Sequence, residues 1–466
     1  MSRAPDRAWD RGRLRSAASR ILLAGLEAAD PRRVVEAQLR LRGSRLRVAG
    51  VEHPLDRGRL VLLAAGKAAS RMARAAEDLL GNRLAESLAV DTSASTPLQR
   101  TRLLLAGHPV PDERGLAAAG EVEGLARRLE ADDLLLVLLS GGASALLPAP
   151  VAGVSLADKA AVTSLLLRAG ATIHELNTVR KHLSRLKGGG LARAAAPARV
   201  VTLALSDVIG DDVSTIASGP TAPDPTTYAD ALAVLRRRGV LESAPPAARR
   251  RLEAGARGEA PETPKPGDAL FRRVTTRVAG SNRLSLEAAA GAARRLGLRP
   301  LVLTSRIEGE AREAARVLVA ILRECAEEER PVPPPACLLA GGETTVTVRG
   351  SGHGGRNQEL VVAAAEPLAG FPRHAVVASL ATDGIDGRSE AAGGVVDEDT
   401  ADRARALGLA PAAAFLAESD SRGFLAPLGD LILTGPTGTN VMDLTLLLAG
   451  SPRRRPRFAK ARKRPL

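Results

Sequence analysis

Short, continuous apolar runs alternate with longer segments of helical periodicity along most of the chain. In the first half, most of these runs end at a glycine-bearing or polar loop, and a helical segment follows. Continuous apolar runs are typical of strands buried on both faces, and their alternation with helices favours parallel sheets. The pattern predicts strands at 60–65, 102–106, 134–139 and 199–205, and helices at 68–80, 115–129 and 165–186.

A proline-rich stretch interrupts this alternation in the middle of the chain. Residues 242–267 hold five prolines among small and charged residues, and we interpret them as the connection between two α/β domains. Beyond it the alternation resumes. The pattern predicts strands at 274–279, 300–304, 337–339, 344–348, 375–380 and 430–433, and helices at 284–296, 310–328 and 357–365.

Length and composition narrow the class of protein. A chain of 466 residues is long enough for two or three domains. The apolar content of 45% excludes a disordered chain, and the aromatic content of 2% excludes the stacking surface that single-stranded nucleic acids require. The two cysteines, Cys325 and Cys337, are too few for a disulfide framework or a Cys-rich zinc site, and they indicate a reduced cytoplasm.

The net charge of +14 is concentrated at one end. Residues 452–466 carry eight Arg and Lys and no acid, which leaves a net charge of +6 for the rest. We interpret 452–466 as a basic, disordered tail and expect no specific nucleic-acid partner, although weak binding to RNA stays open. The uncharged stretch 134–157 contains glycines and prolines that favour a buried strand and a turn over a membrane span. We therefore expect a cytoplasmic protein without a membrane partner.

The polar chemistry lies in the loops. Ligands of open α/β sheets bind beyond the carboxyl ends of strands, where loops lead into helices. Because so many such loops are polar and rich in glycine, the sequence predicts one large polar cleft shared by both domains. These loops are 66–67, 108–112, 140–144, 206–212, 280–282, 341–343, 350–358, 382–387 and 434–440.

Several of these loops are suited to phosphate. The segment Ser140-Gly141-Gly142-Ala143-Ser144 can present backbone N–H groups to an anion, and Lys67 and Arg356 add fixed cations at other loops. Mg²⁺ prefers one or two carboxylates together with phosphate oxygens. This combination favours phosphoryl transfer. The carboxylates that could hold the metal are Asp207, Asp211, Asp212, Asp383 and Asp386.

Two other classes of function stay open. Gly350, Gly352 and Gly355 satisfy the G-x-G-x-x-G pattern of a dinucleotide-binding oxidoreductase. In that pattern an acidic residue ends the next strand about 20 residues on, whereas Asp383 lies 28 residues beyond Gly355. A non-enzymatic ligand-binding or RNA-binding protein is the other class. His174 and His182 are assigned to helix surfaces, because no histidine spacing fits a zinc site.

Taken together, the motifs resemble the type-2 glycerate kinases, a two-domain family whose C-terminal part is called the MOFRL domain. The motifs occur in the family's order over roughly residues 21–448. They are AAGKAASRM (64–72), GHPVPDE (107–113), LSGGASALLPAP (139–150), HELNTVRKHLSRLKGGGLA (174–192), SDVIGDDVSTIASGPTAPDPTT (206–227), AGSN (279–282), GGETTV (341–346), GGRNQE (354–359), ATDGIDG (381–387) and TGPTGTNVMDL (434–444).

The resemblance implies a fold and an activity. It implies a Rossmann-like N-terminal domain with a mainly parallel sheet at 17–255 and a smaller C-terminal α/β region at 270–448, whose MOFRL domain covers about 334–446. The active site would lie in the cleft between them. It also implies ATP-dependent phosphorylation of D-glycerate, with 2-phosphoglycerate as the usual product of bacterial members. Some members were historically labelled hydroxypyruvate reductases, a second source for the redox alternative.

The resemblance also suggests roles for individual residues. Lys67 and Arg356 match the family's proposed catalytic pair, which would neutralise the phosphoryl group or hold the carboxylate of glycerate. Asp207 would deprotonate the attacking hydroxyl or bind Mg²⁺ with Asp383 and Glu343. A homodimer is one state that the sequence allows. The residues expected to bind ATP are Ser140, Gly141, Gly142, Ala143, Ser144, Gly354, Gly355, Asn282 and Asn440.

Overall fold

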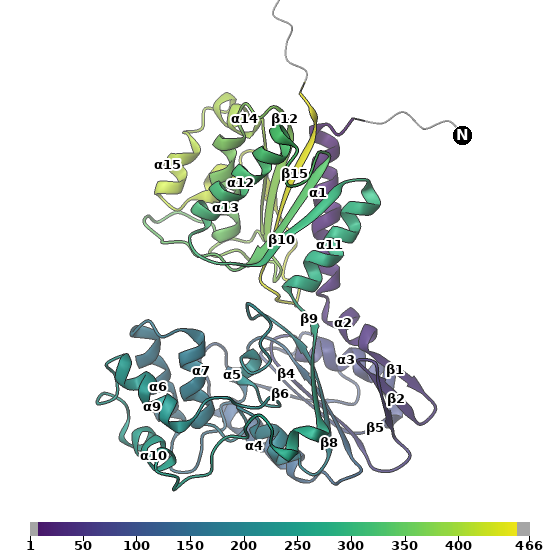
Figure 1. Ribbon diagram of the computed structural model, residues 1–466, viewed down its shortest axis with the longest axis vertical. Helices are drawn as coiled ribbons and strands as arrows, with labels where there is room; N and C mark the ends of the chain where they lie inside the picture. Colours follow the sequence, from purple (N-terminus) through teal and green to yellow (C-terminus); the bar gives the residue numbers. More distant parts are fainter. Residues whose placement is uncertain (1–7, 454–466) are drawn as a thin grey trace, which may run out of the picture. The chain divides into compact units, whose positions relative to one another are not determined.

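The structure is a computed structural model that describes residues 8–453 (Figure 1). The chain divides into two compact units. The N-terminal unit comprises Leu26–Ser285 and Thr437–Met442. The C-terminal unit comprises Leu286–Pro436 with the described parts of Met1–Gly25 and Asp443–Leu466. Residues 17–25, expected in the first domain, group with the C-terminal unit, and 437–442 group with the N-terminal unit.

The N-terminal unit contains a six-stranded sheet in which every pair of neighbours is parallel, as the apolar runs predict. From β4 the chain moves to one side to form β5 and β6, and then returns to β7 on the other side. The connections thus diverge between β4 and β7, which is where ligands bind in open parallel sheets. The strand order is β6 (Arg102–Leu105), β5 (Leu84–Asp91), β4 (Leu60–Ala65), β7 (Leu134–Leu139), β8 (Arg199–Leu205) and β9 (Val274–Gly280).

Helices cover both faces of this sheet. Because side chains alternate along a strand, odd-numbered residues of β7 pack into one core and even-numbered residues into the other. The first core includes α4 (Glu113–Arg127), α5 (Ala143–Leu146) and α8 (Gly190–Ala195). The second core includes α2 (Pro31–Gln38), α3 (Ala69–Leu80) and a small antiparallel sheet of β1 (Leu39–Arg42), β2 (Arg45–Val48) and β3 (Val51–Pro54).

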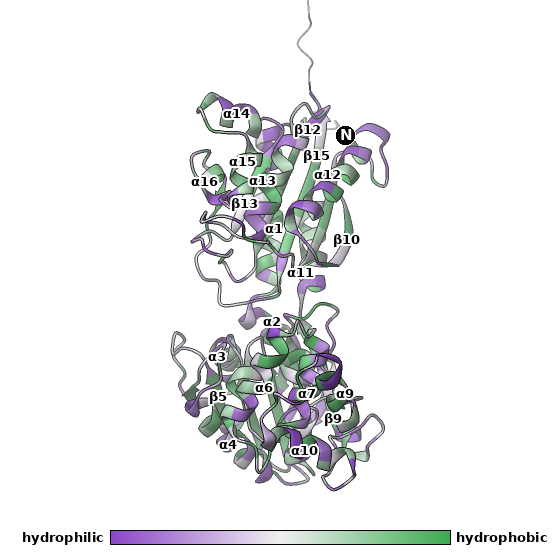
Figure 2. Ribbon diagram, turned by 90° about the vertical axis from the view of Figure 1, so that its left-hand side faces the viewer, coloured by the Kyte–Doolittle hydropathy of each residue, from purple (hydrophilic) through white to green (hydrophobic). Residues whose placement is uncertain are grey.

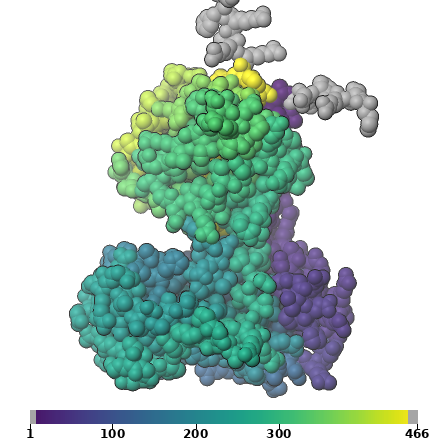
Figure 3. All heavy atoms as spheres, in the orientation of Figure 1, coloured from purple at the N-terminus to yellow at the C-terminus, as the bar shows by residue number. Residues whose placement is uncertain are grey.

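Four further helices of the N-terminal unit form a layer with its own apolar core, the blue-green lobe of that unit in Figure 3. The interpretation of 242–267 as an interdomain connection is wrong. These residues include one of the four helices, and the chain continues from them into β9 of the same sheet. The helices are α6 (Leu156–Arg168), α7 (Ile173–His182), α9 (Tyr228–Arg237) and α10 (Pro246–Ala256).

The C-terminal unit contains a mixed six-stranded sheet. Only β10 and β11 pair in parallel, and the other neighbours are antiparallel, so the expectation of a parallel sheet fails in this unit. Two of the antiparallel pairs arise because β15 returns between β11 and β12, and the other two join β12, β13 and β14. The strand order is β10 (Arg299–Ile307), β11 (Ala336–Gly342), β15 (Asp443–Pro452), β12 (Arg373–Ala381), β13 (Gly393–Asp397) and β14 (Leu431–Ile432).

Two groups of helices cover this mixed sheet. Its strands β12 and β15 are mainly green or white in Figure 2, in keeping with burial on both faces. One face packs against α1 (Arg11–Ala28) and α11 (Asn282–Leu296). The other packs against α12 (Ala311–Glu328), α13 (Arg356–Leu368), α14 (Thr400–Ala406), α15 (Ala412–Ala417) and α16 (Ser421–Leu425). Short 3₁₀ helices lie at Gly81–Arg83, Ile216–Ser218 and Ala269–Arg273.

Some of the strands predicted from the sequence are confirmed and others are not. The strands at 60–65, 134–139 and 199–205 are confirmed to the residue. No strand forms at 344–348. In the expected basic tail, Pro452 ends β15 and Arg453 forms an ion pair with Asp399 (2.8 Å), while 454–466 lie outside the described residues. Within 8–453, no helix combines the length and the apolar character needed to cross a membrane.

Candidate active site

Backbone hydrogen bonds join the loop that follows β4 to the loop that follows β7. The register aligns Ala65 with Leu139, so the strands end together. Beyond them, Ser140 N donates to Ala65 O (3.0 Å) and Lys67 N donates to Gly141 O (2.9 Å). The sequence motifs containing Lys67 and Ser140–Ser144 therefore form one continuous surface at the carboxyl edge of the sheet, where the chain connections diverge.

Gly142 leaves space for two side chains. It has φ +88°, and a Cβ there would come within 3.1 Å of both Lys67 Cγ and His108 Cδ2. Burial, followed by the charge of Lys67, lowers the pKa of His108, so this imidazole is neutral at pH 7. The loop 108–112 is polar in the sequence, but no role was predicted for His108. Its position after a strand of the same sheet is the signal that could have found it.

Asp207 belongs to the same cluster. It follows β8, the neighbour of β7, and its carboxylate occupies the place that a side chain on Gly141 would take. Ser140 Oγ accepts a hydrogen bond from Ala68 N (3.0 Å) at the start of α3. The structure thus brings together Lys67, Ser140–Ser144 and Asp207, which the sequence predicted as separate motifs.

Asn282 and Asn440 also lie in the N-terminal unit. Asn282 Nδ2 donates to Val441 O (2.9 Å), and Asn440 Oδ1 accepts from Met442 N (2.9 Å). The short segment 437–442 is anchored further by Thr439 Oγ1, which donates to Ala29 O (2.6 Å). Asn282 therefore helps to hold the returning segment on this unit, whereas the hydrogen bond of Asn440 lies within the segment itself.

Arg356 is held rigidly in the C-terminal unit. It is the first residue of α13, and its Nε and Nη2 donate to the two carboxylate oxygens of Asp443 (2.6 and 2.9 Å). Burial raises the pKa of Asp443 to about 6, so the carboxylate beside Arg356 is still ionised at pH 7. Nη1 lies 3.1 Å from Glu343 Oε1, an exposed carboxylate after β11. A buried carboxylate thus orients the guanidinium, and an exposed one faces its outer nitrogen.

Asp386 has a structural task that the sequence did not reveal. The residue before α13 is Gly355, which has no side chain to cap the helix. Asp386 replaces that cap, because its carboxylate accepts hydrogen bonds from Asn357 N (3.1 Å) and Gln358 N (2.8 Å). Burial raises the pKa of Asp386. This buried carboxylate supports the helix of Arg356, which disfavours the magnesium role considered for it.

The G-x-G-x-x-G segment lacks the features of a dinucleotide loop. No strand leads directly into it, because β11 ends at Gly342 and the strand expected at 344–348 does not form. Gly350 and Gly352 pack closely against the backbone of Glu418 and Asp420. The space beside Gly354 and Gly355 is taken by Ser421 and Asp386. A larger residue would not fit at these four positions, because other segments of the chain pack against them. The protein itself therefore fills the space beside the glycines.

The residues present fit a nucleotide and Mg²⁺. The space that a Cβ on Gly142 would fill lies beside the Lys67 ammonium stem, where phosphate groups suit the local charge. Within 8–453, no cluster of three or more His, Cys, Asp or Glu residues could hold a metal by itself. Mg²⁺ bound through phosphate oxygens needs only one or two protein carboxylates. Asp207, Glu343 and Asp383 are the candidate donors, and Asp383 already accepts a hydrogen bond from Ile385 N (3.1 Å).

Comparison with known proteins places the chain in a family. Residues 17–253 match the model of a domain of unknown function, DUF4147, and residues 336–443 match the MOFRL family. The glycerate 2-kinase of Pyrococcus horikoshii is 40% identical over 95% of this chain and 99% of its own length. The chain belongs to the glycerate 2-kinase family. This confirms the family indicated by the sequence motifs.

Two further comparisons extend this result. The crystal structure of glycerate kinase from Thermotoga maritima matches with a TM-score of 0.84 at 39% identity, and the match covers 94% of this chain and 99% of that one. A protein of Agrobacterium vitis named putative hydroxypyruvate reductase is 42% identical over 95% of this chain. The redox name thus occurs within the same family.

Proposed function

We propose that this protein is a cytoplasmic glycerate kinase that transfers a phosphoryl group from ATP to D-glycerate, with 2-phosphoglycerate as the product. The observation that carries the proposal is the cluster of Lys67, Ser140–Ser144 and Asp207 at the diverging connections of a parallel sheet, in a chain of this family. Lys67 is exposed and forms no ion pair with any described residue, so its charge is available to an anion.

The residues of the cluster have separate tasks in the proposed reaction. Backbone N–H groups of Ser140–Ser144 bind phosphate oxygens, and Lys67 stabilises the negative charge of the phosphoryl group during transfer. Mg²⁺, when bound, would take an oxygen ligand from a carboxylate such as Asp207 and would supply positive charge against the phosphate groups. The substrate hydroxyl oxygen attacks the terminal phosphorus, the bond to ADP breaks, and the hydroxyl proton leaves. Asp207 takes that proton or supplies an oxygen ligand to the metal.

Arg356 acts on the other end of glycerate in this proposal. A guanidinium held by a bidentate partner presents its remaining N–H groups in a fixed direction, which suits a planar carboxylate. Asp443 provides that fixed hold. Glu343 is exposed and is displaced when the substrate carboxylate binds Nη1. Asn282 and Asn440 are proposed as positioning groups of the ATP site, whereas the filled space beside Gly354 and Gly355 disfavours the ATP contact predicted for them.

The test is a turnover assay with D-glycerate, ATP and Mg²⁺, followed by ³¹P NMR of the products. A parallel assay supplies hydroxypyruvate and NADH to the same preparation. Formation of 2-phosphoglycerate without NADH oxidation supports the proposal. NADH oxidation without phosphoglycerate would show that the protein is a hydroxypyruvate reductase and not a kinase. Formation of 3-phosphoglycerate would show that the phosphoryl group is transferred to the hydroxyl on carbon 3 instead of carbon 2.

A further inference from the structure

A cavity lies in the N-terminal unit, and its lining residues differ from those of the proposed active site. It has a volume of about 600 Å³ and is lined by residues from α4, α7, α8, α9 and α10 and the loops that join them. None of the residues predicted to bind ATP, glycerate or metal lines it. This volume is in the usual range for sites that bind small molecules.

The lining of this cavity is strongly basic. Six Lys and Arg side chains line it, against two Glu. Arg127 and Arg185 both pair with Glu123 (2.6 and 2.8 Å). Lys181 pairs with Asp224 (3.2 Å), a buried carboxylate beside the cavity. These pairs account for three of the six cations.

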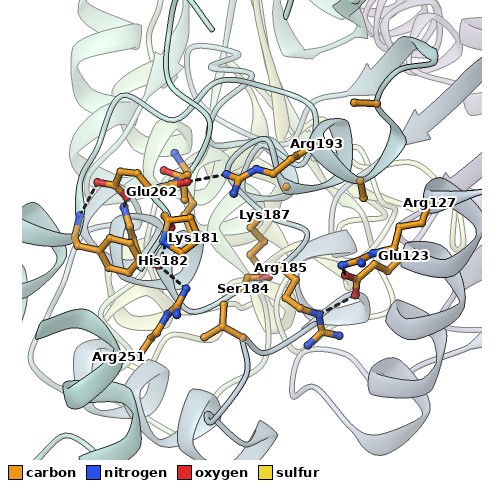
Figure 4. Close-up of a pocket in the computed structure, with 17 residues that line it drawn as sticks. Glu123, Arg127, Lys181, His182, Ser184, Arg185, Lys187, Arg193, Arg251 and Glu262 are labelled. Carbon is orange, nitrogen blue, oxygen red and sulfur yellow. Dashed lines mark hydrogen bonds and ion pairs between the residues drawn. The ribbon is translucent and has the colours of Figure 1, made fainter. Parts of the chain in front are cut away.

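The other three cations have no carboxylate partner among the described residues. They are Lys187, Arg193 and Arg251, and they surround the same space in the close-up (Figure 4). Arg193 Nη2 donates only to a backbone oxygen, Glu262 O (2.8 Å), and Arg251 Nη2 donates to Tyr228 Oη (2.9 Å). Arg251 Nε is buried and has no hydrogen-bond partner in the described chain. The arginine pair therefore brings to the cavity positive charge that no described carboxylate neutralises.

Lys187 and its neighbours also depart from what the sequence suggested. Lys181, Lys187 and His182 are all buried, so the expectation that His182 lies on a helix surface is wrong. Burial, followed by the charge of Arg180, lowers the pKa of Lys187 to about 7. Its Nζ donates to Ser144 O (2.7 Å) and Leu147 O (3.2 Å). Through Lys187 the cavity therefore contacts the carbonyl group of Ser144, the last residue of the proposed phosphate loop.

We propose that this cavity binds a small phosphate compound with at least two negative charges, as a site separate from the active site. Two arginine forks and an ammonium group match a group with several acceptor oxygens, and the hydroxyl of Tyr228 adds a polar contact. An occupant changes the charge environment of Lys187 and thereby the hold on Ser144. This second effect rests on the proposed function, because it acts on the binding of ATP.

The binding test uses the full chain and inorganic pyrophosphate, measured by calorimetry at constant ionic strength. The background is Lys67→Ala, which weakens pyrophosphate binding at the proposed active site. Arg251→Ala and Arg193→Ala are compared with Arg236→Ala, an exposed arginine outside the cavity that forms no ion pair with the described residues. Arg193 is exposed, so its variant folds even where Arg251→Ala does not, as circular dichroism will show.

We expect pyrophosphate to bind about tenfold more weakly to each cavity variant and unchanged to Arg236→Ala. Equal affinity in all three variants, or no binding in the Lys67→Ala background, overturns the site. Citrate serves as the control for the chemical class. If citrate binds as tightly as pyrophosphate and competes with it, the cavity takes polycarboxylates and the phosphate assignment is wrong.

The coupling to the active site is tested by kinetics in chains that retain Lys67. Pyrophosphate should change the KM for ATP more in Arg236→Ala than in Arg251→Ala, because simple competition at the nucleotide site affects both variants equally. Equal changes overturn the coupling and leave the binding result standing. If neither variant phosphorylates glycerate, the proposed function fails, whereas the calorimetric result still decides whether the cavity binds phosphate.

Discussion

Lys67 and Arg356 differ in how firmly the protein holds them. No described residue forms an ion pair with Lys67, whereas Arg356 is fixed by the buried Asp443. The sequence located both cations, because each stands in a short motif at a loop. It did not identify Asp443 as a partner, since this residue begins a strand 87 positions further along the chain. Contacts of that kind depend on the antiparallel insertion of β15.

Lys67→Ala should lower kcat by about 10²–10³-fold, the usual cost of removing one group that stabilises transition-state charge. The free energy of unfolding should change by less than about 0.5 kcal/mol, because the side chain is exposed and has no ion-pair partner to leave behind. Steady-state kinetics and urea unfolding measure the two effects. Near-normal turnover would show that Lys67 has no part in the chemistry.

Arg356→Ala should lower both turnover and stability, because it leaves the Asp443 carboxylate buried without its cation. Breaking such a pair costs about 3–5 kcal/mol. Replacing both partners, as in Arg356→Ala with Asp443→Asn, should recover much of the stability but none of the turnover. Recovery of turnover in the double variant would contradict a role of Arg356 in substrate binding.

Entire elements decide which side chains reach the site. Strands buried on both faces, such as β4, β7 and β8, were predicted to the residue because their apolar runs are continuous. The strands β1–β3 were missed, since their four-residue segments alternate apolar and charged residues at the periphery. The cap of α13 was also hidden, because Asp386 lies about 30 residues after the helix start and reaches it only in the folded chain.

Asp386→Ala should destabilise the protein by about 1–2 kcal/mol through loss of the cap on α13. Since Arg356 is the first residue of that helix, kcat should fall as well, although Asp386 does not touch Arg356 in the structure. Asp386→Asn keeps an acceptor oxygen and should recover part of both losses. Unfolding followed by circular dichroism, together with kinetics, tests this. An alanine variant with normal stability would rule out the cap.

The lowered pKa of Lys187 should make the stability of the protein depend on pH. Its pKa falls from 10.5 to about 7 on folding, so the unfolded chain binds more protons than the folded one between those values. The free energy of unfolding should therefore rise with pH from about 7 to 10, by at most about 1.4 kcal/mol per pH unit from this group. Lys187→Met should remove this contribution. Identical slopes in urea unfolding of the two proteins at pH 7, 8 and 9 would contradict it.

The whole chain contains two units, one built on a parallel sheet and the other on a mixed sheet. Sequence motifs in the correct order were sufficient to predict the family, because together they span most of the chain, from about residue 21 to 448. They could not show the boundaries of the two units, since the chain passes between the units several times and the segment 437–442 returns to the N-terminal one. Such returns leave no local signal in composition or periodicity.

Deletion of residues 454–466 should leave kcat and KM unchanged. The family-model matches end at residue 443, and none of the predicted site residues lies in this segment. Kinetics of the shortened chain at two salt concentrations measure the effect. A large loss of turnover would mean that the basic residues take part in substrate binding.

The most direct test of the account remains the ³¹P NMR spectrum of the products formed from D-glycerate, ATP and Mg²⁺, recorded for the unmodified chain and for Lys67→Ala. The account predicts a 2-phosphoglycerate signal that grows with time for the unmodified chain and is nearly lost for Lys67→Ala. Absence of any phosphoglycerate from the unmodified chain, or an equal signal from both proteins, would contradict it.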